Sequence, residues 1–127
     1  MANWMIKAGQ LVQPLINLMQ DNILSYDILQ MDETRVQVLN EDGRTAQSQS
    51  WMWVQRGGPP NQRLILYHYN SSRSQSVPKE RLTGFSGYLQ TDGYDAYNAA
   101  VIENNLTHLG CMAHARRKFK STTEKQR

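Results

Sequence analysis

The first 24 residues repeat apolar side chains at spacings of three and four. This spacing predicts a helix over residues 3–24, with apolar side chains on much of its circumference. Pro14 predicts a kink, or the start of a second helix near that point. So wide an apolar surface predicts that the helix packs on more than one surface, including that of a further domain or partner. The apolar side chains are those of Trp4, Met5, Ile6, Leu11, Val12, Leu15, Ile16, Leu18, Met19 and Ile23.

The next part of the chain replaces this period with short apolar and β-branched runs divided by turn residues. Asp42-Gly43 is a turn pair typical of a hairpin, and two glycines followed by two prolines at positions 57–60 end a strand. Alternation around Trp51 and Trp53 predicts that both rings are buried on one face of a sheet. The expected strands cover residues 28–32, 35–39, 51–56 and 64–69.

The second half of the chain alternates predicted strands with predicted helices. Residues 87–91 have the apolar and aromatic character of a buried strand, Asp92-Gly93 forms a turn, and a helix follows. Ser76 is the expected N-cap of a short helix that precedes them. Hairpins followed by such crossovers predict an α/β fold, a mixed sheet with helices packed on it. The remaining expected elements are helices over residues 77–82, 94–104 and 113–126 and a strand over residues 106–111.

Composition adds little to this pattern, but the distribution of charge does. A chain of 127 residues that is 39% hydrophobic and 20% charged has the size and composition of one ordinary globular domain. The net charge of +3 is uneven: residues 1–110 hold 8 Lys/Arg and 10 Asp/Glu, whereas residues 111–127 hold 6 Lys/Arg and 1 Glu. The predicted C-terminal helix is therefore either a phosphate-binding surface or an ordinary solvated helix face.

The sequence also limits where the protein is expected to work. No apolar run approaches the roughly 18 residues that a membrane helix needs. The N-terminus lacks the basic start and long apolar segment of a secretory signal. Cys111 is the single cysteine, so no internal disulfide can form, and a reducing compartment is expected.

Two acidic residues stand where strands of the predicted sheet end. Asp32 closes the first expected strand, and Asp92 follows the strand over residues 87–91. If these strands are neighbours, both carboxylates lie at one edge of the sheet, where α/β folds commonly bind ligands. Paired carboxylates suit Mg²⁺, and two such ions about 4 Å apart support phosphoryl transfer. Asp-Gly is also an ordinary turn pair, and a generic α/β domain with acids only in turns would hold these carboxylates far apart.

Three ordered blocks of the sequence resemble transposases of the insertion-sequence-66 type. The blocks are residues 31–34 (Met-Asp-Glu-Thr), residues 89–97 (Leu-Gln-Thr-Asp-Gly-Tyr-Asp-Ala-Tyr) and residues 110–119 (Gly-Cys-Met-Ala-His-Ala-Arg-Arg-Lys-Phe). The run Trp-Met-Trp-Val from residue 51 and the N-terminal helix are also similar to segments of that family. The resemblance covers nearly the whole chain.

This resemblance implies a fold, a chemistry and a set of partners. The implied fold is a ribonuclease-H-like core with an Asp-Asp-Glu metal triad, in which Asp32 is the first acid and Asp92 the second. The implied reaction is cleavage and strand transfer of DNA with Mg²⁺ or Mn²⁺, and the implied partners are transposon ends and target DNA. A cytoplasmic, nucleoid-associated bacterial protein is expected, divided into an N-terminal helical segment (residues 1–24) and a partial catalytic domain (residues 25–127).

The chain departs from the family pattern at both ends. The third acid of the family lies beyond the block over residues 110–119, and Glu124 stands in a basic helical setting that does not match it. Met1 corresponds to an interior position of the family. The chain is therefore expected to be a truncated transposase, unable to carry out full transposition alone. The alternative is a non-catalytic remnant that binds DNA or associates with a full-length transposase or a second copy.

The other polar residues receive narrower predictions. Glu33 follows Asp32 and should point to the opposite face of the strand, and Asp95 should interact with a helix dipole. Cys111 and His114 have a spacing that zinc could use, but a structural zinc site usually needs four protein ligands and no second Cys/His pair exists. A helix cap or a DNA phosphate is therefore the favoured partner of His114. Phosphate contacts are likewise favoured over simple solubility for Arg116, Arg117, Lys118 and Lys120.

Overall fold

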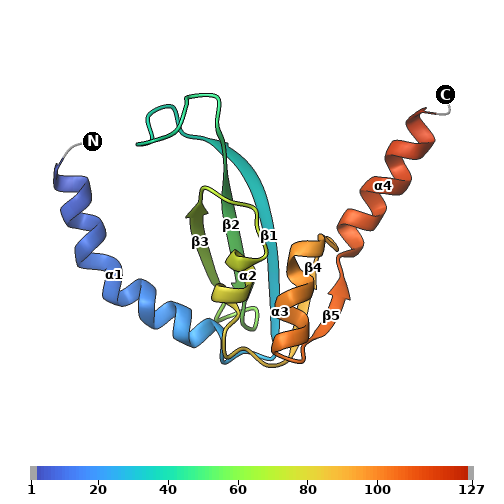
Figure 1. Cartoon of the computed structure of the whole chain (residues 1–127). Helices are drawn as coiled ribbons and strands as arrows, with labels where there is room; N and C mark the ends of the chain where they lie inside the picture. The colour runs from blue at the N-terminus through green and yellow to red at the C-terminus, as the bar shows by residue number, and fades with distance from the viewer. Residues whose placement is uncertain (1–2, 126–127) are drawn as a thin grey trace.

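The structure is a computed structural model that describes residues 3–125, with side chains described as far as residue 121. Three strands follow the first helix, and helices and strands alternate after them as the sequence predicts. Both end helices extend away from the sheet (Figure 1). The elements are α1 (Asn3–Ile23), β1 (Ile28–Gln37), β2 (Gln49–Gly57), β3 (Leu64–Asn70), α2 (Ser76–Arg81), β4 (Tyr88–Thr91), η1 (Asp95–Tyr97), α3 (Asn98–Glu103), β5 (Thr107–Gly110) and α4 (Met112–Lys125).

The five strands form one mixed sheet in the order β3-β2-β1-β4-β5. The pairs β1–β2 and β2–β3 are antiparallel hairpin neighbours, whereas β4 and β5 join through crossovers and run parallel to β1. Parallel pairing places the carboxyl ends of β4 and β5 on the side of the sheet toward which β1 also runs. The predicted mixed α/β architecture is therefore present.

Strand β1 is longer than the sequence pattern predicts. The expectation of two strands over residues 28–32 and 35–39 is wrong, because β1 pairs with β2 without interruption from Leu29 opposite Gly57 to Gln37 opposite Gln49. The acidic pair at its centre does not break the strand, since alternation sends one carboxylate to each face. The pairing of β1 with β4 is much shorter and ends at Gln30 opposite Gln90.

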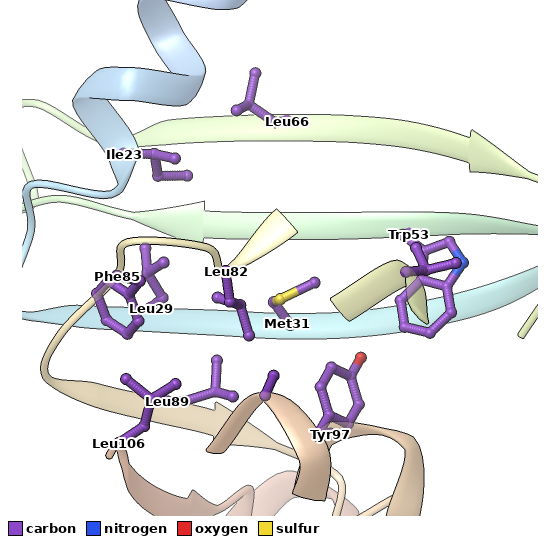
Figure 2. Close-up of a cluster of buried hydrophobic side chains, with 12 residues drawn as sticks. Ile23, Leu29, Met31, Trp53, Leu66, Leu82, Phe85, Leu89, Tyr97 and Leu106 are labelled. Atoms are coloured by element: carbon purple, nitrogen blue, oxygen red, sulfur yellow. The ribbon is translucent and has the colours of Figure 1, made fainter. Parts of the chain in front are cut away.

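One face of the sheet carries the core. Leu29, Leu89 and Trp53 are fully buried there under α2, η1 and α3. Figure 2 shows the Tyr97 ring beside Trp53, and the ring centroids are 6.0 Å apart in an edge-on arrangement. Trp51 lies on the same face as Trp53, as predicted, but it is only partly buried.

The opposite face of the sheet is open to solvent. Ile28, Ile65 and Tyr88 each precede a buried core residue along their strands and are 44–52% exposed. Tyr67, on β3, is 70% exposed. Alternation therefore separates a covered face from an open face, and the short helices α2 and α3 both lie on the covered side.

Two helix starts differ from the predictions. Ser76 is not the N-cap of α2: Gln75 holds that position without a side-chain cap, and the Ser76 hydroxyl bonds instead to that of Ser74 at 2.6 Å. The helix expected from residue 94 begins as the 3₁₀ turn η1 before α3 continues it. Its predicted apolar face is correct, because Tyr97 and Ala100 are fully buried.

Helix α1 contacts the rest of the chain through its last turns. It is one helix that includes Pro14, and Figure 1 shows it bending along its length. Ile23 is fully buried and Met19 packs on the core, whereas Trp4 and Leu11 are 69% and 82% exposed. Among the described residues, no helix combines the length and the apolar character that crossing a membrane requires.

Candidate functional site

Asp32 projects from the open face of β1, just past the point where pairing with β4 ends. Its side chain is 53% exposed, and its Oδ1 accepts a hydrogen bond of 2.9 Å from the Glu33 backbone N–H. The residue lies inside β1 and not at its end, because the strand continues for five further residues.

Asp92 leaves β4 at its carboxyl end in a tight turn. Its Oδ1 accepts a hydrogen bond of 2.9 Å from the Tyr94 backbone N–H, an Asx turn that fixes the carboxylate. Gly93, between them, has a φ of +88°, a conformation that side-chain-bearing residues rarely adopt. The Thr91 hydroxyl accepts a hydrogen bond from the Gly93 N–H at 3.1 Å, which holds the turn from its other side.

The start of α4 brings a histidine to the same edge. The Cys111 backbone N–H donates to the Thr91 carbonyl at 2.8 Å, so the chain leaving β5 stays beside the end of β4. His114 follows one turn later, and its N–H donates to the Cys111 carbonyl at 3.1 Å. Its Nε2 lies 3.5 Å from Oδ2 of Asp32.

Asp32, Asp92 and His114 together have the geometry of a metal-binding group. One ligand atom from each residue lies within 4.8 Å of the other two. Two oxygens on one Mg²⁺ are at most about 4.2 Å apart, twice the bond length of about 2.1 Å. Two carboxylates without a cation repel each other, so the limit for an empty site is somewhat wider. The donor set therefore fits a divalent ion, and the far-apart carboxylates expected of a generic α/β domain are not found.

The surface beside these residues is hollow and partly basic. Arg117 lines one hollow together with Asp32, Asp92 and His114. Arg116, Arg117 and Lys120 line a second one along α4. Lys118 is exposed on the same helix. The structure thus brings His114 and Arg117 to the acidic pair, whereas Arg116, Lys118 and Lys120 lie elsewhere on α4.

Glu33, in contrast, belongs to the covered face, as its place after Asp32 predicts. Its side chain is 1% exposed, and its Oε1 accepts hydrogen bonds from Nε and Nη2 of Arg73 at 2.9 and 2.6 Å. The Tyr97 hydroxyl donates to Oε2 at 2.6 Å. Burial, and then this hydrogen bond to Glu33, raise the pKa of Tyr97 well above its ordinary value.

Arg73 is the residue of this network that sequence reasoning missed. It lies in the polar loop after β3, and its guanidinium carbon is 3.7 Å from the Tyr94 ring centroid and 4.6 Å from that of Trp51. The Tyr94 hydroxyl donates to the Arg73 carbonyl at 3.1 Å, which ties this loop to the turn after Asp92. The sequence signal was available: an acid on a buried strand face needs a cationic or hydrogen-bonding partner.

The remaining candidates lie outside the cluster. Asp95 is exposed in the first turn of η1. The group of ligand atoms around Asp32 that the described residues form includes His114 but not Cys111. A hydrogen bond of the Cys111 side chain with His114 lowers the pKa of the thiol.

Comparison with known proteins gives this geometry a context. The family described as "Transposase IS66 family" matches residues 1–127. Uncharacterized protein y4qI of Sinorhizobium fredii (strain NBRC 101917 / NGR234) is 32% identical over 94% of this chain and 24% of its own length. Uncharacterized protein y4jD of the same strain is 30% identical over 91% of this chain and 25% of its own length. The chain thus spans about a quarter of the length of these relatives.

A solved structure shows the same fold. It is a chain of the cryo-EM structure of the simian T-cell lymphotropic virus intasome in complex with PP2A regulatory subunit B56 gamma. The TM-score is 0.52 at 16% sequence identity, over 70% of this chain and 33% of that chain. The predicted α/β fold class, a mixed sheet with helices packed on it and a preceding N-terminal helix, is confirmed.

Proposed function

The chain belongs to the IS66 transposase family, as its three sequence blocks predicted, and we propose that it supplies two of the metal-holding carboxylates of a DNA transposase. Asp32 and Asp92 are the proposed catalytic and metal-binding residues, and Mg²⁺ or Mn²⁺ is the proposed ion. The observation that carries the proposal is the meeting of these two acids, 60 positions apart in the sequence, with ligand atoms within 4.8 Å. The proposed reaction is phosphodiester cleavage and strand transfer in DNA.

The two acids are prepared for this role by their hydrogen bonds. Each carboxylate uses one oxygen to accept a backbone N–H, which fixes its orientation and leaves its second oxygen for a ligand. A bound divalent ion supplies a Lewis acid that activates the attacking oxygen and stabilises charge on the phosphate. Asp32 and Asp92 hold and orient this ion on the open face of the sheet, where a nucleic acid can approach.

The proposed DNA contacts follow the basic helix. Arg117 lines the hollow that contains the acidic pair, so its charge can attract the phosphate next to the reacting bond. Arg116, Lys118 and Lys120 extend the same charge along α4 and are proposed to contact the backbone further away. Contacts of this kind position DNA without reading its sequence.

The proposed domain division and surroundings follow from the same reading. Residues 25–127 form part of a catalytic domain, and residues 1–24 form an N-terminal helical segment. Transposon ends and target DNA are the proposed partners, in the bacterial cytoplasm and in association with the nucleoid. The exposed apolar side chains of α1 are proposed to contact a full-length transposase or a second copy.

A second candidate function rests on one observation at the site. Within the described part of the chain, the third member of the ligand group is a histidine and not a carboxylate. The alternative is therefore a non-catalytic protein that binds DNA or a full-length transposase. It predicts salt-sensitive DNA binding that ignores Mg²⁺ and persists when both aspartates are replaced by asparagine.

The test measures binding of Mn²⁺ by titration calorimetry. Asp92→Asn should weaken Mn²⁺ binding at least about tenfold, or about 1.4 kcal/mol, because one charged ligand is lost while the Asx turn is kept. Asp95→Asn is the matched control, since this neighbouring acid is exposed and lies outside the cluster. Equal Mn²⁺ affinity in the wild type and in Asp92→Asn would refute the proposed metal site. Loss of DNA cleavage or strand transfer in the Asp32→Asn/Asp92→Asn double variant would exclude the non-catalytic alternative.

A further inference from the structure

We infer that His114 is a nitrogen ligand of the ion held by Asp32 and Asp92, so that the site binds Zn²⁺, Co²⁺ or Mn²⁺ with higher affinity than Mg²⁺. This inference rests on the proposed function, because it needs the two acids to hold an ion. It goes beyond that proposal by assigning a third ligand and the chemical class of the metal. The sequence alone favoured a cap or a phosphate contact for this residue.

The position of His114 is set by the backbone and not by a flexible side chain. The hydrogen bond from the Cys111 N–H to the Thr91 carbonyl ties the start of α4 to the end of β4, directly before Asp92. The first turn of α4 then presents the imidazole toward β1. Since short backbone links fix all three residues to neighbouring strands, the group is already assembled in the chain without a ligand.

One ligand atom from each of the three residues lies within 4.8 Å of the other two. Oδ1 of Asp32 and Oδ1 of Asp92 already accept backbone hydrogen bonds, so the other carboxylate oxygens remain for a ligand. The imidazole of His114 directs Nε2 toward Oδ2 of Asp32, while Nδ1 is buried behind it. An imidazole protonated at Nδ1 carries its lone pair on Nε2, the atom that lies 3.5 Å from Oδ2 of Asp32.

A nitrogen ligand changes which metal the site prefers. Mg²⁺ binds oxygen ligands and keeps much of its water, whereas imidazole suits zinc and the transition metals. Affinity for a mixed nitrogen and oxygen site rises from Mn²⁺ through Co²⁺ toward Cu²⁺ and stays high for Zn²⁺. Two carboxylates and one imidazole also leave coordination positions open, as in catalytic zinc sites with three protein ligands.

The experiment compares Zn²⁺ and Mg²⁺ binding to the whole chain and to His114→Ala, at about pH 8 so that imidazole is neutral and free to ligate. His68→Ala is the matched control, because His68 lies on β3 in the groove beside α1, outside the ligand group. We expect His114→Ala to weaken Zn²⁺ binding at least about tenfold and to change Mg²⁺ binding much less. A second readout is the ¹⁵N resonance of the imidazole, since Zn²⁺ should shift Nε2 of His114 and leave that of His68 in place.

The outcomes separate this inference from the proposed function. If Asp92→Asn loses both metals while His114→Ala binds Zn²⁺ as the wild type does, the carboxylate site stands and the nitrogen ligand is refuted. His114 is then a phosphate contact or an ion-pair partner of Asp32. If Asp92→Asn binds both metals like the wild type, the proposed function and this inference both fail. A selective loss of Zn²⁺ in His114→Ala, together with the Nε2 shift, supports both.

Discussion

Asp32 and Glu33 are neighbours on one strand, yet their carboxylates lie in opposite surroundings. Glu33 points to the covered face, where its side chain is 1% exposed and Arg73 and Tyr97 supply three short hydrogen bonds. Asp32 points to the open face, where its side chain is 53% exposed and faces a second carboxylate, that of Asp92. Glu33 is therefore paired within the protein, whereas Asp32 keeps an exposed carboxylate beside Asp92 and His114.

The contrast shows how a structural acid differs from a candidate catalytic one. Burying a carboxylate is costly unless its oxygens are all paired, so the covered face had to provide Arg73 and Tyr97. Holding two carboxylates together with no cation between them also costs free energy, and nothing in packing requires it. Glu33, whose oxygens are paired by the chain, stabilises the fold, whereas two acids held close together on an open face support the proposed metal site.

The largest expected effect comes from removing each carboxylate in turn. Glu33→Ala should lower the free energy of unfolding by about 3 kcal/mol, because it leaves the Tyr97 hydroxyl without its acceptor on the covered face and Arg73 without its carboxylate partner. Asp32→Ala should change it by no more than about 0.5 kcal/mol, as an exposed substitution does. Urea unfolding in the presence of a chelator measures both.

A double variant tests whether Glu33 acts through Arg73. Arg73→Met should also be strongly destabilising, since it leaves a buried carboxylate with only Tyr97 as partner. The Glu33→Ala/Arg73→Met pair should lose less stability than the two single losses added, because the interaction is removed only once. Equal losses for Glu33→Ala and Asp32→Ala would show that the two faces do not differ in the way described.

The local sequence pattern predicts much of the fold. The main error falls where contacts between distant residues decide the structure. The helix expected over residues 3–24 is α1, and the hairpins and crossovers come in the predicted order. The division of β1 into two strands failed because the acidic pair looks like a break in the sequence, whereas the continuous ladder with β2 carries the strand through it. The prediction of Ser76 as N-cap is wrong because α2 begins at Ser76 itself, whose hydroxyl bonds to that of Ser74.

The site was predictable to the extent that strand order was. Asp32 and Asp92 were expected to meet because parallel neighbours bring their carboxyl ends to one edge, and β1 does pair with β4. The approach of His114 to them depends on the direction of α4 after β5, which no local pattern gives. A crossover from β4 to β5 makes the two strands parallel, and this pairing places the helix after β5 at the same edge as Asp92. The predicted strand–helix–strand order was therefore the signal that could have placed His114 near the acids.

A smaller effect is expected on DNA binding at the open face. Arg117→Gln should reduce the slope of log affinity against log salt concentration by about 0.9 for duplex DNA, because one phosphate is then no longer neutralised. Lys79→Gln serves as the control, because Lys79 lies on α2 on the covered side of the sheet, where it pairs with Glu103. Fluorescence anisotropy with a labelled duplex at several salt concentrations gives both slopes. Identical slopes for the two variants would place Arg117 outside the DNA interface.

The smallest expected effect concerns a titrating group on the covered side. Burial, and then the nearby charge of Arg81, lower the pKa of His68 below its ordinary 6.5. As pH falls below about 6.5, the unfolded chain takes up a proton at this residue that the folded chain does not, so folding stability falls until the lower folded pKa is reached. His68→Gln removes this proton uptake, and its stability should therefore decline less than that of the wild type as pH falls from about 7 through 6.5. Urea unfolding at a series of pH values measures both stabilities. If the two proteins lose the same free energy of unfolding as the pH falls, the covered face does not disfavour the charged imidazole of His68.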